Sequence, residues 1–363
     1  MSRYRSVLAW SAAGSGLVTL LANLAVESSL IFLPLFAQDL GASKFQIGII
    51  GATYGITYFT SSWIFGRLSD LKGRLVFVRI GLGSSMLTLA LQTLATNAVA
   101  FMLVRSLVGL CLGVSAAALI AYNFEAGGNT GRFASLGSLG WLLGTIVAMF
   151  VSSYNILFLV SAASCGLAFI ISIFLKEPEK RFSVRPDIKQ VTRRNLRIYL
   201  SFLLRQLGAN IVWVVLPLFM VSLGASKTWI AILSAINTGG QVVAMMLVGR
   251  FGASRLFTFG FVLSAAVFLG YAASTNYLQL IPSQVLLALA WSCLYVGALM
   301  LLLKKNEERA TATGILFSAI SISGTVGPFL GGLAAQLWGY PPLMYIAAGF
   351  SLAGLVVAVM PER

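Results

Sequence analysis

Apolar residues occur along the chain in runs of roughly 20, and short polar segments separate these runs. A helix rises 1.5 Å per residue, so about 20 apolar residues cross a hydrocarbon core of about 30 Å. The pattern predicts an all-α membrane protein. Its twelve expected spans are residues 8–38, 45–66, 75–95, 98–122, 133–152, 154–175, 196–223, 228–249, 255–273, 277–303, 310–336 and 341–360.

One connection between the expected spans is longer than the others. It covers residues 176–195, contains Pro178 and Pro186, and is rich in charged residues. Such a segment is typical of a linker. We therefore expect a six-helix bundle at residues 1–175, a cytoplasmic linker at 176–195, and a second six-helix bundle at 196–363.

The two halves share a sequence repeat at an offset of 183 residues. The segment 33–67 aligns with 216–250 without a gap, and 14 of the 35 positions are identical, including LPLF, LGASK and GR. Parallel repeats of six helices are found in transporters whose halves move about a central site. The repeat thus predicts two pseudo-symmetric bundles with the same orientation.

The composition agrees with a membrane location: 58% of the residues are hydrophobic, 10% are charged, and the mean hydropathy is +0.92. The net charge of +15 would suggest nucleic acid as a partner for a soluble protein. Here the charges are divided between the two sides of the membrane: the loops expected on one side contain only Lys44 and Lys227 among the basic residues. By the positive-inside rule, both termini and the linker are expected to be cytoplasmic, because the other side carries most of the Lys and Arg: Arg3, Arg5, Arg67, Lys72, Arg74, Arg132, Lys180, Arg181, Arg193, Arg194, Arg250, Arg255, Lys304, Lys305 and Arg309.

Targeting and metal-binding signals are weak in this sequence. The first apolar segment runs to Leu40 and contains Glu27, which disfavours a cleaved signal peptide. The three cysteines, Cys111, Cys165 and Cys293, lie in expected spans without the spacing of a disulfide framework or a zinc site. We expect no metal and no cofactor.

The segment from Gly66 to Arg74 (GRLSDLKGR) follows the second expected span. It resembles the signature of the major facilitator superfamily, with Leu71 and Leu75 at positions where that family usually has basic residues. The resemblance covers the whole chain in architecture and implies the fold of that family. It also implies a cytoplasmic latch that favours the outward-facing state, formed by Gly66, Asp70, Gly73 and Arg74.

The chemistry of these residues suits a latch. Asp70 can accept hydrogen bonds at a helix N-terminus, and Gly73 permits a tight turn. Arg74 can hold a carboxylate bidentately, and Glu125 at the end of the fourth span is the nearest candidate. The second half keeps Gly249 and Arg250 of the repeat but has Ala253 at the position of Asp70, so only the first half carries the full latch.

Two further segments resemble elements of the family. Residues 105–109 (RSLVG) resemble its Arg-x-x-x-Gly element, and residues 324–332 (GTVGPFLGG) resemble a glycine-proline signature of its drug–proton antiporters. In those antiporters the signature lies in the fifth helix. The fifth expected span of this chain, residues 133–152, has Gly137, Gly140 and Gly144 followed by Thr145. We interpret these glycines as helix-packing positions and hinge sites.

Ionisable residues within the spans are few. Glu27 is the only carboxylate well inside a span, and Arg105 and Arg205 are the only cations there. Such residues mark ion and substrate pathways. The chain has no His, so proton coupling must use a carboxylate. Glu27 and Arg105 are expected at similar depths in the membrane, so their side chains can meet. We expect them to form a proton-coupling pair. The alternative is a permanent structural ion pair.

Polar residues also recur at equivalent positions in both halves. Asn23 and Glu27 correspond to Gln206 and Asn210, four residues apart on one helical face in each case. We expect a substrate cavity between the halves, lined by Asn23, Glu27, Tyr54, Tyr58, Arg105, Trp141, Gln206, Asn210, Asn237, Gln241, Trp291 and Tyr295. Pro34 and Pro217 are expected bending points.

The sequence favours a secondary transporter that moves a small organic solute by alternating access across a cytoplasmic membrane. The resemblance to drug-efflux branches implies efflux of lipophilic compounds coupled to protons. The alternative is uptake or exchange of an organic anion or sugar-like metabolite, for which Arg205 is the candidate determinant of charge selectivity. A membrane enzyme would need a nucleophile with a base, and a sensor would normally carry a soluble domain. The resemblance also implies a functional monomer in the lipid bilayer.

Overall fold

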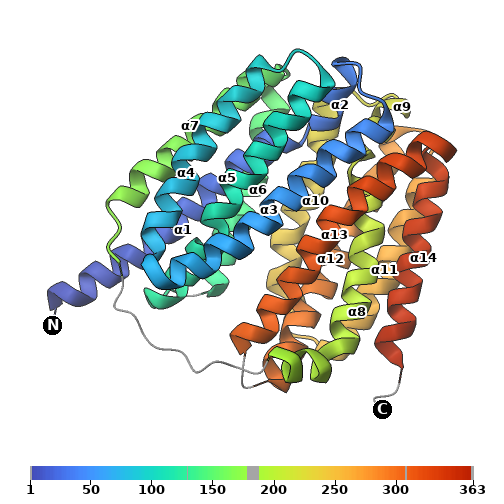
Figure 1. The fold of residues 1–363 in the computed structure, drawn as a ribbon. Helices are drawn as coiled ribbons and strands as arrows, with labels where there is room; N and C mark the ends of the chain where they lie inside the picture. Colours follow the sequence, from blue (N-terminus) through green and yellow to red (C-terminus); the bar gives the residue numbers. More distant parts are fainter. Residues whose placement is uncertain (1, 129, 178–187, 307–308, 361–363) are drawn as a thin grey trace. The chain divides into compact units, whose positions relative to one another are not determined.

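The computed structural model describes residues 2–128, 130–177, 188–306 and 309–360 (Figure 1). Within these ranges all regular structure is helical. The first half contains α1 (Ser2–Leu30), α2 (Leu33–Asp39), α3 (Lys44–Lys72), α4 (Arg74–Leu91), η1 (Gln92–Leu94), α5 (Ala98–Glu125), α6 (Thr130–Phe150) and α7 (Tyr154–Ile173). The second half contains α8 (Ile188–Trp213), α9 (Leu216–Ser222), α10 (Lys227–Val248), α11 (Ala253–Ala273), η2 (Tyr277–Gln279), α12 (Leu280–Lys305), α13 (Arg309–Trp338) and α14 (Tyr340–Val359).

The helices form two sets of six when each interrupted pair, α1–α2 and α8–α9, is taken as one segment. In the described residues, nine helices are long and apolar enough to span a membrane, or ten if the α8–α9 pair, bent by 48°, is one span. Helix α6 has a shorter apolar stretch, Ser135–Phe150. The expected all-α membrane fold is therefore confirmed.

Proline positions determine where these two segments are interrupted. A proline ring clashes with the carbonyl four residues earlier and lacks an N–H donor. Helix α1 ends at Leu30, four residues before Pro34, and α8 ends at Trp213, four residues before Pro217. Both prolines then occupy the first turn of the next short helix, where the missing donor costs nothing.

The sequence repeat is also a structural repeat. Gly41 and Gly224, at the 183-residue offset, both have a positive φ, 82° and 89°, and each ends a short helix. Ser43 and Ser226 then accept a hydrogen bond from the backbone N–H three residues later and begin α3 and α10. The same local chemistry therefore reverses the chain at the same place in each half.

The helix neighbours within each half follow the same pattern. In the first half α1 packs against α6 and α7, and α4 packs against α5 and α7. In the second half α8 packs against α13 and α14, and α11 packs against α12 and α14. Figure 1 shows the helices of each half running side by side. The repeat thus extends from the aligned segment to the packing of whole helices.

The compact units differ from the expected domain boundaries. Unit 1 comprises residues 1–42 and 53–182, and unit 2 comprises 43–52 and 183–363. Residues 43–52 belong to unit 2, in which Gly48 packs closely against Gly332 of α13. A Cβ added at Gly48 would lie 2.8 Å from the Cα of Gly332. The absence of side chains at both positions permits this close approach of two backbones.

The expected linker at 176–195 was too long at its C-terminal end, because α8 begins at Ile188. Hydropathy marks where a helix leaves the apolar layer and not where its hydrogen bonding ends. The first turns of α8 are polar, and Asn195 is buried there. Its amide exchanges two hydrogen bonds with that of Asn306 at the end of α12, at 2.8 and 3.1 Å.

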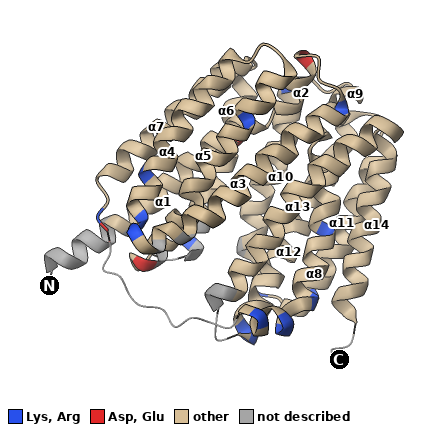
Figure 2. Cartoon of the chain, in the orientation of Figure 1, with Lys and Arg blue, Asp and Glu red and all other residues tan. Residues whose placement is uncertain are grey.

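Charged residues gather at helix ends. Figure 2 shows, for unit 2, that described Lys and Arg residues gather where α8 begins and α12 ends. The last turn of α12 contributes Lys304 and Lys305. Cations are favourable near the C-terminal end of a helix dipole.

Candidate functional site

Glu27 is the central residue of a buried polar cluster in unit 1. It lies on α1, is 6% exposed, and accepts a hydrogen bond of 3.1 Å at Oε1 from the hydroxyl of Thr145 on α6. The same hydroxyl lies 3.1 Å from the backbone carbonyl of Trp141, one helical turn earlier. Thr145 has a single proton and therefore donates to one of these two acceptors at a time.

The glycines of α6 bring the helix backbone onto the polar face of α1. A Cβ added at Gly144 would lie 2.8 Å from the Cβ of Glu27, and one at Gly140 would lie 3.0 Å from the Cβ of Asn23. Gly137 would likewise meet the side chain of Asn23 at 2.9 Å. The close approach of the two helices positions Thr145 beside Glu27, which supports the interpretation of these glycines as packing positions.

The expected pairing of Glu27 with Arg105 was wrong. Both residues are described, and no ion pair joins them within the described part of the chain. Arg105 on α5 instead donates from Nη1 to the hydroxyl of Ser29, at 2.9 Å. Residues two positions apart on a helix are rotated about the helix axis by about 200°, so Glu27 and Ser29 point to nearly opposite sides and face different neighbours. Similar depth in the membrane was not enough to bring the pair together.

Arg105 connects four elements of unit 1. Besides Ser29 on α1, its Nη1 donates to Oε1 of Gln92 in η1, at 3.1 Å. Its guanidinium lies over the ring of Tyr54 on α3, 4.6 Å from the centroid, and Tyr54 stacks on Tyr58. Arg105 is 3% exposed, and all these partners are uncharged. The polar residue Gln92 in an expected apolar span was the sequence signal for this cluster.

Unit 2 contains the equivalent of the Glu27 cluster without the carboxylate. Asn210 on α8 donates to the hydroxyl of Ser323 on α13, at 3.2 Å. A Cβ added at Gly327 would lie 2.4 Å from the Cβ of Asn210. Gly327 and Asn210 are the counterparts of Gly144 and Glu27 at the 183-residue offset. The two halves therefore share this helix contact, and only the first half places an ionisable group in it.

Arg205 occupies a buried site in unit 2. It is fully buried and donates from Nε to Ser264 on α11, at 2.9 Å, and from Nη1 to Gln206, at 3.0 Å. Among the described residues, its Nη2 has no hydrogen-bond partner. The guanidinium also lies 5.5 Å from the ring centroid of Trp291. The Arg205 side chain is thus enclosed by neighbouring residues of unit 2 and is not exposed to solvent.

The other expected cavity residues of unit 2 are neighbours in pairs. On α10, Gln241 donates to the side-chain oxygen of Asn237 at 2.9 Å. On α12, Trp291 and Tyr295 stack at 5.3 Å with an interplanar angle of 10°. Trp291 therefore lies between Arg205 and Tyr295 and connects the cation to an aromatic stack.

The expected latch residues are close together in unit 1. Arg74 begins α4, and its Nε and Nη2 donate to Oε1 of Glu125 at the end of α5, at 3.1 and 2.8 Å. Its Nη1 donates to Ser69, at 2.8 Å. Gly73 precedes the helix with φ 102°, a conformation that favours glycine. The side chain of Asp70 lies outside the described residues.

Glu177, in the expected linker, has a role that the sequence pattern did not predict. The two carboxylate oxygens of Glu177 accept hydrogen bonds from the backbone N–H groups of Arg74 and Leu75. A carboxylate at these unpaired amides stabilises the start of α4. In return, Arg79 on α4 donates to carbonyls at the end of α7, including that of Leu175 at 3.0 Å. The two helix ends thus hold each other, and the backbone before the linker is anchored.

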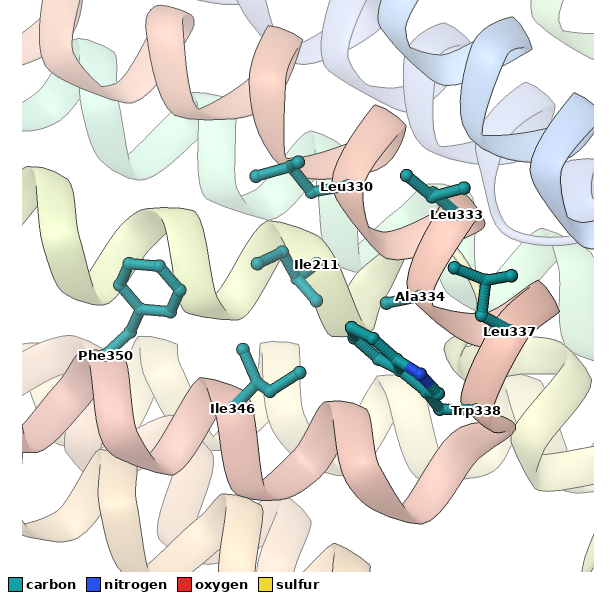
Figure 3. Close-up of a pocket in the computed structure, with 8 residues that line it drawn as sticks. All are labelled: Ile211, Leu330, Leu333, Ala334, Leu337, Trp338, Ile346 and Phe350. Carbon is teal, nitrogen blue, oxygen red and sulfur yellow. The ribbon is translucent and has the colours of Figure 1, made fainter.

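An apolar pocket of about 200 Å³ lies in unit 2. Figure 3 shows side chains from α8, α13 and α14 around it, with Leu337 and Trp338 at one end and Phe350 at the other. None of its eight lining residues is ionisable. A solute-binding site usually combines apolar walls with a few oriented polar groups. We therefore assign no part of the transport site to this pocket.

The Major Facilitator Superfamily model matches residues 15–197 and 198–363, which together cover both halves. The chain belongs to the major facilitator superfamily. It is therefore a multi-pass membrane transporter and not an enzyme.

Relatives that align with most of this chain include multidrug resistance proteins. Multidrug resistance protein MdtG of Proteus mirabilis (strain HI4320) is 25% identical over 367 residues, covering 92% of this chain and 90% of MdtG. MdtG of Klebsiella pneumoniae (strain 342) is 23% identical over 92% of this chain and 88% of its own.

Solved structures share the fold of this superfamily member at low sequence identity. The crystal structure of the nucleoside transporter NupG matches with a TM-score of 0.79 and 13% identity, covering 96% of this chain and 98% of NupG. The human organic anion transporter MFSD10 (TETRAN) matches with a TM-score of 0.71 and 15% identity, covering 97% and 99%. These likenesses show the fold alone.

Proposed function

We propose that this transporter exports small lipophilic compounds from the cytoplasm in exchange for protons that bind Glu27. The observation that carries the proposal is the contact between the buried Glu27 carboxylate and the hydroxyl of Thr145. A carboxylate inside a span is costly unless it is paired or functional. Glu27 has no cationic partner within the described residues, so no permanent ion pair blocks the exchange of its proton.

The Thr145 hydroxyl can accommodate both forms of the carboxyl group. When Glu27 is ionised, Thr145 donates its proton to Oε1. When Glu27 is protonated, its own O–H donates to the Thr145 oxygen, and Thr145 donates to the carbonyl of Trp141, also 3.1 Å away. Each state leaves these groups hydrogen-bonded, which lowers the cost of moving a proton through the site.

The similarity to MdtG proteins over about 90% of their length supports the choice of efflux over uptake. The cytoplasmic contacts of Arg74 with Glu125 support a latch role for these residues and for Gly66 and Gly73. We further propose that both termini lie on the cytoplasmic side of a cytoplasmic membrane, from the distribution of Lys and Arg. A monomer is proposed because twelve spans suffice for function in this family.

The experiment follows a pH-sensitive dye in energised inside-out vesicles that contain wild type, Glu27→Gln or Asp39→Asn. Asp39 is the matched control, because its carboxylate lies outside the cluster and accepts a hydrogen bond from Tyr154. We expect lipophilic cations to cause proton release with wild type and Asp39→Asn but not with Glu27→Gln. A response that survives in Glu27→Gln would contradict proton coupling through Glu27.

A second candidate function is the transport of an organic anion, and Arg205 favours it. This guanidinium is buried among neutral groups, and its Nη2 has no hydrogen-bond partner in the part of the chain that the structure describes. An anionic substrate group could satisfy such a donor. The same vesicles, loaded with Arg205→Lys or Arg205→Gln protein, test this candidate: it requires an anion-dependent flux that Lys partly retains and Gln abolishes. No anion-dependent flux with wild type would exclude it.

A further inference from the structure

A second pocket of unit 2, distinct from the apolar one, combines basic and apolar residues. It has a volume of about 240 Å³ and lies near the ends of α8, α11, α12 and α14 that carry the basic cluster of Figure 2. Its buried lining residues include Ile198, Phe257 and Ala358, all apolar. Its exposed lining residues include Lys304 and Lys305. Apolar walls therefore meet positive charge at the mouth of one pocket.

The electrostatics of this pocket favour an anion. Arg197 also lines it, so three cations converge there, and none of the lining residues that the structure describes is acidic. Ser254, which also lines the pocket, lies in the first turn of α11. The backbone N–H groups of this turn receive no hydrogen bond from a capping side chain, because the N-cap residue is Gly252. The positive end of the α11 dipole thus adds to the charges of the side chains.

A structural role accounts for part of this charge. Arg197 donates from Nη1 to the carbonyl of Met360 and so stabilises the end of α14. Lys304 and Lys305 lie in the last turn of α12, where cations are favourable. These contacts explain why cations occur at helix ends. They do not explain why cations from two helices surround one hollow with an apolar floor.

The position of the pocket and the apolar surface beside it favour a membrane lipid as the bound molecule. Basic pockets between helices at the cytoplasmic boundary bind phosphate headgroups of anionic lipids. Val262 on α11 lies one helical turn beyond Thr258, which lines the pocket, and is 46% exposed. This side chain can contact an acyl chain along the span, whereas a free phosphate would gain nothing from it.

We propose that this pocket binds the phosphate headgroup of an anionic phospholipid such as phosphatidylglycerol, with Arg197, Lys304 and Lys305 around the phosphate and the acyl chains along α11. The site is separate from the Glu27 cluster. The proposal is therefore independent of the solute that the protein carries and of its coupling to protons.

The experiment measures lipid binding to the purified full-length protein by native mass spectrometry in neutral detergent. It compares wild type with the double variant Lys304→Gln/Lys305→Gln. The matched control is Lys189→Gln/Arg193→Gln, which removes two exposed charges near the start of α8 that do not line the pocket. Phosphatidylglycerol, phosphatidylcholine and inorganic phosphate are the probes, and thermal unfolding checks that every variant is folded.

We expect phosphatidylglycerol to bind wild type more tightly than phosphatidylcholine. Removal of two basic residues near an anionic headgroup should weaken its binding by about 30-fold. The matched control should bind within about 2-fold of wild type. Equal losses in both double variants would show a diffuse surface charge, and binding that is unchanged in Lys304→Gln/Lys305→Gln would exclude the pocket. Displacement of the lipid by inorganic phosphate at equal concentration would show a site for soluble anions, and this result would also overturn the proposal.

Discussion

Thr145 shows how one hydroxyl can make a buried carboxylate usable. Its oxygen lies 3.1 Å from both Glu27 Oε1 and the Trp141 carbonyl, so its single proton has two acceptors. Without this hydroxyl, both the ionised and the protonated form of the carboxyl group would lose this hydrogen-bond partner. In the sequence, Thr145 stood out only as the neighbour of Gly144.

The role of this hydroxyl is testable by two substitutions. Thr145→Ser keeps the hydroxyl and should retain most of the proton-coupled flux. Thr145→Val has nearly the same shape but removes the hydrogen bond, and should lower the flux about 5- to 10-fold, as expected for the loss of about 1 kcal/mol or slightly more. Initial rates in the vesicle assay measure the effect. Equal rates for Ser and Val would show that the hydroxyl has no part in proton exchange.

Gly144 controls the distance between α6 and α1. A Cβ at this position would lie 2.8 Å from the Cβ of Glu27 and 2.9 Å from the carbonyl oxygen of Leu24. We expect Gly144→Ala to destabilise the protein by about 1–3 kcal/mol, because one of the two helices must shift. Thermal unfolding monitored by tryptophan fluorescence measures the change.

Gly324 provides the matched control for this substitution. It lies within α13, and a Cβ added there would meet nothing within 4 Å. Gly324→Ala should be neutral or stabilise the helix by about 0.5–1 kcal/mol, because alanine has the higher helix propensity. If both variants lose the same stability, the loss does not arise from the α1–α6 contact.

At the scale of the element, the start of α4 depends on a residue far away in the sequence. Glu177 accepts hydrogen bonds from the amides of Arg74 and Leu75, while Glu125 binds the side chain of Arg74. One carboxylate thus fixes the helix start, and the other fixes the arginine. Both contacts belong to the segment that resembles the family signature.

Amide hydrogen exchange separates these two carboxylates. In Glu177→Ala the amides of Arg74 and Leu75 lose their acceptor, so their exchange should speed up about 5-fold, in line with about 1 kcal/mol for a helix cap. In Glu125→Gln these amides should exchange as in wild type, because Glu125 contacts the side chain only. Unchanged exchange in Glu177→Ala would contradict the capping role.

At the scale of the whole molecule, the placement of charges predicts the orientation in the membrane. Arg193 lies near the start of α8, and Thr275 lies beyond the end of α11, and both are exposed. The three native cysteines are buried. In intact cells a membrane-impermeant maleimide should label Thr275→Cys and leave Arg193→Cys unlabelled. In inside-out vesicles the pattern should reverse, and the same pattern in both preparations would contradict the assigned orientation.

Hydropathy, proline positions and the 183-residue repeat were sufficient to predict the main features of the fold. Each of these signals acts locally. Apolar runs partition into lipid as helices, Pro34 and Pro217 break a helix four residues earlier, and Gly41 and Gly224 supply the positive φ that a turn requires. Identical local chemistry therefore produced identical local structure in both halves, and the sequence could reveal it.

The partners of the buried charged residues could not be predicted in the same way. Glu27 and Arg105 have similar depths, yet the helical rotation turns Glu27 towards Thr145 and Ser29 towards Arg105. Glu177 reaches α4 across about a hundred residues of chain, and Arg205 finds Ser264 on a different helix. Contacts of this kind depend on the rotation and spacing of packed helices, which arise only when the helices assemble. The sequence itself therefore determined the helices, their breaks and their repetition, whereas their packing determined which polar groups meet.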